Sequence, residues 1–113
     1  QPVTEPEPAP APLRHEGVET IPIDEDIVTI IVWMSGPATG EDLIAYSRCA
    51  AAGYAVNRGY GFARHVRTNV DVEGSTRSAD AVYTVSPTLP RGLQTIDAEV
   101  TVADCAEQGI PTV

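Results

Sequence analysis

The fold of this chain is limited first by a run of eight residues from Ile27 to Met34, in which only Thr29 is polar. Most of these side chains are β-branched and the run is short, so it predicts a β-strand. Both alternating faces of this strand are apolar, which is typical of a strand covered on two sides. One face consists of Ile27, Thr29, Ile31 and Trp33, and the other of Val28, Ile30, Val32 and Met34.

The segment that follows predicts a helix. A Ser-Gly-Pro sequence at 35–37 ends the strand, and Thr39 with Asp42 three residues later resembles a capping box. The helix is expected to end at Asn57 or Gly59. Its apolar stripe consists of Leu43, Tyr46, Ala50 and Tyr54.

Three later segments alternate between apolar and polar residues with a period of two. They span 62–72, 79–85 and 94–103, and this pattern predicts half-buried antiparallel strands. The order is therefore strand, helix, strand, strand, strand. We expect an α+β fold, a two-layer sandwich with one helix packed on a mostly antiparallel four-stranded sheet.

The first part of the chain differs in composition from the rest. Five prolines lie within residues 1–12, and residues 1–26 carry seven acidic side chains against one arginine. Such a composition favours a semi-rigid, solvated segment over a packed one. We expect a Pro-rich acidic spacer or tail over 1–20 and a single domain over 21–113.

The two cysteines, Cys49 and Cys105, predict one disulfide if the protein is exported. A bridge closing this span would stabilise the fold by about 4 kcal/mol in the chain-entropy description. The alternative is a pair of separate buried cysteines in a cytosolic protein. The chain starts at Gln1 without a methionine, which fits a removed secretory signal, and we expect a periplasmic or cell-envelope location.

Charge and motifs exclude several functions. The chain has 16 acidic residues against seven basic ones, all arginine, for a net charge of −9. This field repels phosphate, so nucleic-acid binding by phosphate neutralisation is excluded. No apolar run approaches the roughly 20 residues that a membrane span needs. Phosphate loops, nucleophile elbows and Cys/His metal spacings are absent from the sequence, so we expect no enzyme activity, cofactor or metal.

Four polar residues form a possible ligand-binding set on the polar face of the predicted sheet. They are His65, Arg67, Asp97 and Glu99. The alternative is a solvated face on which carboxylates pair with arginines. His65 with a carboxylate could also act as the general base of a small hydrolase or isomerase.

One apolar face of the first predicted strand is expected to be left over, because one helix cannot cover both sides of a sheet. We expect Val28, Ile30, Val32 and Met34 to contact a protein partner or a second copy of the chain. The alternative is local cover by residues 21–23. The leading hypothesis is a non-catalytic exported structural or interaction module, held near a membrane if an anchor exists.

Part of the chain resembles a family of small alphaproteobacterial envelope lipoproteins of unknown function. In that family a strand is followed by a Thr-capped helix with a tyrosine, an Arg-Ala-Ala-like core and a Gly-Tyr-x-x-Phe-like turn. The matching residues are Thr39, Tyr46, Arg48, Ala50, Ala51, Gly59, Tyr60 and Phe62. The resemblance implies an exported α+β domain and carries over no catalytic residue.

Overall fold

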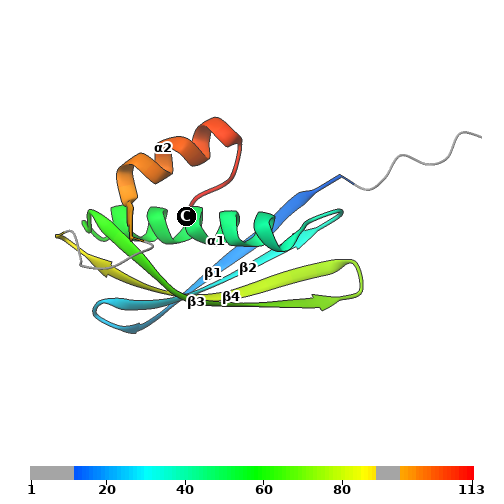
Figure 1. Ribbon diagram of the computed structural model, residues 1–113, viewed down its shortest axis with the longest axis horizontal. Coiled ribbons are helices and arrows are strands. Elements are labelled where there is room, and N and C mark those ends of the chain that lie inside the picture. Colours follow the sequence, from blue (N-terminus) through cyan, green and yellow to red (C-terminus); the bar gives the residue numbers. More distant parts are fainter. Residues whose placement is uncertain (1–11, 89–94) are drawn as a thin grey trace, which may run out of the picture.

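One antiparallel sheet with the strand order β1-β2-β4-β3-β5 organises the computed structural model, which describes residues 12–88 and 95–113 (Figure 1). Both helices lie on the same side of this sheet. The strands are β1 (Arg14–Asp24), β2 (Ile27–Ser35), β3 (Phe62–Glu73), β4 (Thr76–Ser86) and β5 (Thr95–Asp97), and the helices are α1 (Gly40–Asn57) and α2 (Ala98–Gln108). The α+β class is confirmed, with one more strand and one more helix than the sequence predicts.

The predicted strand and helix at the centre of the chain are confirmed as β2 and α1. The capping box is present, since the Asp42 amide donates to the Thr39 hydroxyl at 3.2 Å and the Thr39 amide donates to the Asp42 carboxylate at 2.8 Å. The hydrogen bonds from Thr39 hold the pKa of Asp42 below its usual value. The helix ends at Asn57, which is one of the two expected positions.

The strand predicted over 94–103 is wrong for most of its length. Only 95–97 pair with β3, and residues 98–108 form α2, while Gln94 lies outside the described residues. Asp97 caps the helix by accepting a hydrogen bond from the Val100 amide at 3.1 Å, and Gly109 ends it in the left-handed conformation at φ 71°. These two end signals outweigh the apolar alternation between them.

The first described strand was not predicted. β1 pairs with β2 from Arg14 opposite Ser35 to Asp24 opposite Ile27, and Val18 packs against the core. The boundary expected between residues 20 and 21 therefore falls inside β1. Its position at the sheet edge suits a strand that contains Pro22 and many acids. Residues 1–11 of the predicted spacer lie outside the described residues.

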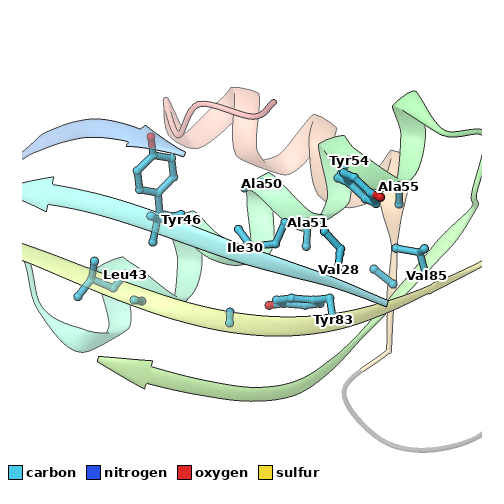
Figure 2. Packing of buried hydrophobic residues seen from close by; sticks show 14 of the residues in the cluster. Val28, Ile30, Leu43, Tyr46, Ala50, Ala51, Tyr54, Ala55, Tyr83 and Val85 are labelled. Carbon is cyan, nitrogen blue, oxygen red and sulfur yellow. The ribbon is translucent and has the colours of Figure 1, made fainter. Parts of the chain in front are cut away.

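The core lies between α1 and one face of the sheet (Figure 2). Small residues such as Ala50 and Ala51 allow the helix to approach β2 and β4 closely. The four side chains expected to contact a partner lie here with no exposed surface, namely Val28, Ile30, Val32 and Met34. The prediction of a partner surface at these residues is wrong, because α1 of the same chain covers them. The uncovered face of β2 is the opposite one.

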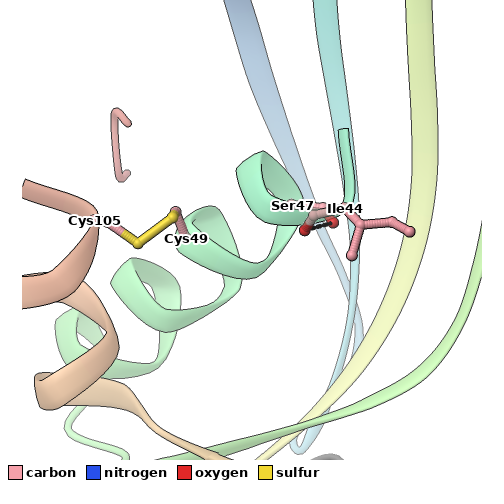
Figure 3. The surroundings of a disulfide bond; sticks show 4 residues. All are labelled: Ile44, Ser47, Cys49 and Cys105. Carbon is pink, nitrogen blue, oxygen red and sulfur yellow. Dashed lines mark hydrogen bonds between the residues drawn. A yellow bond between two sulfur atoms is a disulfide. The ribbon is translucent and has the colours of Figure 1, made fainter. Parts of the chain in front are cut away.

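The predicted disulfide is confirmed. Cys49 of α1 and Cys105 of α2 are joined with their Cα atoms 6.0 Å apart (Figure 3). The bond fixes α2 on the outer side of α1, away from the sheet (Figure 1). An intramolecular disulfide is consistent with an oxidising, exported environment.

The C-terminal residues return across α1. The Asn57 side chain donates a hydrogen bond to the Val113 carbonyl oxygen at 3.1 Å. A Cβ atom at Gly53 would lie 2.8 Å from the same oxygen, so a glycine is needed for this close approach. The end of the chain is thus packed against the helix.

Candidate functional site

A cavity of about 480 Å³ lies beside α1, over β3 and β4. Its volume is within the range of small-molecule sites. Two isoleucines and four polar side chains line it: Ile44, Arg48, His65, Thr68, Tyr83 and Ile96. They come from α1, β3, β4 and β5.

A β-bulge at Val66 shapes the floor of this cavity. His65 pairs with Tyr83 and Arg67 pairs with Val82, so Val66 is the extra residue of β3. In a regular strand, residues three apart point to opposite faces. The bulge instead places His65 and Thr68 on the face that α1 covers, where Nε2 of His65 lies 2.6 Å from Oγ1 of Thr68.

The imidazole also contacts a buried tyrosine. The rings of His65 and Tyr83 meet edge to face, with centroids 5.3 Å apart. Burial raises the pKa of Tyr83, while a hydrogen bond to Ser47 and the positive charge of Arg48 act in the opposite direction. The Tyr83 hydroxyl is therefore neutral at physiological pH and lies within the electrostatic reach of Arg48.

Helix α1 forms the mouth of the cavity. Ile44 and Arg48 are four residues apart and therefore neighbours on one side of the helix, and both are exposed. Between them, buried Ser47 donates its hydroxyl to the Ile44 carbonyl oxygen at 2.9 Å (Figure 3). Among the described residues, the lining includes no carboxylate. Arg48 is therefore the one permanently charged side chain in the described lining, in a chain with a net charge of −9.

The structure does not bring together the four residues of the predicted ligand set. His65 lies in the cavity, whereas Arg67 lies on the opposite face of the sheet with Nη1 3.9 Å from the Asp80 carboxylate. Asp97 and Glu99 are the N-cap and first-turn residues of α2. The alternation of β3 could not indicate this arrangement, because the bulge changes which residues share a face.

Five side chains of the cavity are not among the predicted site residues: Ile44, Arg48, Thr68, Tyr83 and Ile96. The sequence holds one signal for them. Arg48 is a charged residue inside the small apolar sequence of α1, beside Cys49 and Ala50. Its neighbours Cys49 and Ala50 are buried and Arg48 is exposed, so the arginine marks the edge of the buried side of the helix.

A second candidate surface is the sheet face opposite α1, which no described segment covers (Figure 1). We call it the open sheet face. Its apolar residues are Ile21 of β1, Ile27, Ile31 and Trp33 of β2, and Val82 of β4. Except for Ile21, which is 40% exposed, they are half-buried by one another. Charged residues of both signs lie beside and among them: Glu19 on β1, Asp80 on β4 opposite Ile31, and Arg64, Arg67, Asp71 and Glu73 on β3.

The described parts of the chain show neither of two other kinds of site. Neither helix there has the length and apolar character to cross a membrane. Residues 12–88 and 95–113 also contain no group of three or more His, Cys, Asp or Glu side chains that could hold a metal ion.

The fold and these surfaces define a small disulfide-linked α+β domain with one covered and one open sheet face. The chain belongs to the YNQ4 C-terminal domain family, whose model matches residues 15–109, from β1 to the end of α2. The function of this family is unknown. The envelope-lipoprotein character expected from the sequence stays a prediction.

One curated relative is similar over most of the chain. It is the uncharacterized 26.9 kDa protein in the nqo8 5' region of Paracoccus denitrificans, which is 30% identical over 87 residues. The alignment covers 77% of this chain but 34% of the Paracoccus protein, so the chain spans about a third of that relative's length. No solved structure matches the chain.

Proposed function

We propose that this domain is a non-catalytic, exported interaction module that pairs with a second copy of itself through the open sheet face. One observation carries the proposal: apolar side chains of β1, β2 and β4 lie together on a sheet face that no described segment covers. The disulfide between Cys49 and Cys105 supports the exported location.

These apolar side chains explain why the face needs a partner. β2 is apolar on both sides, and α1 covers one of them. Ile27, Ile31 and Trp33 remain on the other side, and Val82 of β4 lies opposite Thr29, diagonal to both isoleucines. Contiguous apolar patches of this kind mark interaction sites in soluble proteins. Two such sheets can pack face to face about 10 Å apart, as in β-sandwiches.

The flanking charges favour a second copy over an unrelated partner. A twofold axis parallel to the strands, between β2 and β4, would place β1 of one copy over β3 of the other. Glu19 of one copy would then lie over Asn69 of the other, one diagonal step from Arg67, and the same pair would form twice. The face therefore offers acidic and basic side chains, as well as apolar ones, that a twofold axis could bring together.

The oligomeric state tests the proposal. We expect sedimentation velocity of the oxidised full chain to show a monomer–dimer equilibrium that shifts to dimer with concentration. Ile31→Glu should keep the chain monomeric, because it buries a carboxylate among the apolar side chains of the open sheet face. Val100→Glu makes the same kind of change at a position of α2 that is 58% exposed, and should dimerise like the parent. A chain that is monomeric at every concentration would overturn the proposal.

A further inference from the structure

We infer that the cavity beside His65 binds a small organic carboxylate with an apolar body, such as an aryl or branched-alkyl acid. This site lies on the helix side of the sheet, whereas the proposed pairing uses the opposite face. The inference is therefore independent of the proposed function, and either can fail alone.

The shape and lining of the cavity indicate the apolar part of the ligand. Its volume of about 480 Å³ is large enough for a ring or a branched chain. Ile44 at the mouth and Ile96 from β5 offer aliphatic surface, and the buried Tyr83 ring forms part of the wall. Burial of apolar ligand atoms against these side chains would supply binding free energy.

The polar groups indicate the carboxylate. Arg48 is in no ion pair with the described residues, and its planar guanidinium matches a carboxylate in a two-point contact. The Thr68 hydroxyl and the His65 imidazole lie across from it in the same lining. Because no carboxylate lies among the described lining residues, the Arg48 guanidinium is available there to an anionic ligand group.

The bulge at Val66 prepares these groups for binding. The contact of 2.6 Å between His65 and Thr68 and the edge-to-face contact with Tyr83 fix the orientation of the imidazole. A site that is already ordered loses little conformational entropy when its ligand enters. Inorganic phosphate could meet Arg48 and Thr68 but would leave both isoleucines without a ligand atom to pack on, so an apolar carboxylate suits the lining better.

The experiment is an NMR titration of the full oxidised chain with indole-3-acetate, with its neutral amide and with inorganic phosphate. We expect saturable shifts for the carboxylate at Arg48, His65 and Thr68. Binding of the amide should be about tenfold weaker, because the charged contact is lost. Saturation by phosphate at equal or higher affinity, or the absence of saturation by the carboxylate, would overturn the inference.

A matched pair of variants separates Arg48 from general charge effects. Arg48→Gln should weaken indole-3-acetate binding by about tenfold. Arg58→Gln changes another arginine at the end of the same helix, where the guanidinium stacks 4.8 Å over Tyr54, and should bind like the parent. Both variants should retain the oligomeric state of the parent. Equal affinity of the Arg48 variant and the parent would contradict the proposed site.

Discussion

Nε2 of His65 lies 2.6 Å from the hydroxyl oxygen of Thr68, although the two residues are three apart on one strand. Only the bulge at Val66 makes this contact possible. The same irregularity directs His65 toward Tyr83 and leaves Arg67 on the other side of the sheet. The extra residue Val66 thus determines which side chains of β3 face the cavity and which face the open side of the sheet.

The contact between His65 and Thr68 should contribute to the free energy of unfolding. Thr68→Val keeps the shape of the side chain and removes the hydroxyl, so the free energy of unfolding should fall by about 1 kcal/mol. Urea titration followed by circular dichroism would measure it. Thr20→Val, on β1, is the control, because the described structure shows no hydrogen bond for its hydroxyl, and its stability should match that of the parent. Equal losses in both variants would contradict a role for the contact.

If Glu19 and Arg67 of the open sheet face meet across the dimer, exchanging their charges should restore the dimerisation that either single change weakens. Glu19→Arg and Arg67→Glu should each weaken dimerisation, because each places like charges opposite one another across the proposed twofold axis. The double variant should regain affinity, since the pair is reversed. Sedimentation velocity at low and moderate salt would measure this, and additive losses in the double variant would show that the two residues do not meet.

The disulfide should stabilise the fold and hold α2 in place. Reduction of the bond between Cys49 and Cys105 should lower the free energy of unfolding by up to about 4 kcal/mol. Amide hydrogen exchange should rise first in residues 98–108, because α2 packs mainly on α1. The double variant Cys49→Ala/Cys105→Ala should not respond to the reductant. A parent chain with unchanged exchange in α2 after reduction would argue against this role.

The capping box should make stability depend on pH in the acid range. The pKa of Asp42 is lowered by hydrogen bonds from Thr39, so its carboxylate stabilises the fold above its unfolded pKa of about 4. This stability is lost as the pH falls through the lower folded pKa. Unfolding of the parent and of Asp42→Asn at several pH values should show a smaller acid loss for the variant. Glu41→Gln, next to it in the first turn, should keep the acid loss of the parent.

The central elements could be predicted because their signals are local. The β-branched run of β2, the Thr39 cap of α1 and the alternation of β4 each arise within a few neighbouring residues. The pairing of Cys49 with Cys105 followed from there being only two cysteines.

The predictions are wrong where tertiary contacts, and not local sequence, determine the structure. On β1, Val18 packs against the core, but the strand also contains Pro22 and several acidic residues. Its sequence therefore lacks the apolar pattern from which a strand is predicted. Alternation at Val100 and Val102 suited a strand, but packing against α1 and the cap at Asp97 select a helix. Which face of β2 meets α1 depends on register, which no local pattern fixes. The cavity depends on the bulge and was missed for the same reason.

The disulfide between the helices also restrains residues that lie away from the two cysteines. α2 follows β5 without an intervening loop, and Ile96 of β5 belongs to the cavity wall. Cys105 therefore anchors, through the seven helical residues 98–104, a wall that is also held by the pairing of β5 with β3 and by the packing of Ile96 on the core. In a thiol-rich compartment this one covalent anchor would be lost, while the pairing and packing of β5 would remain.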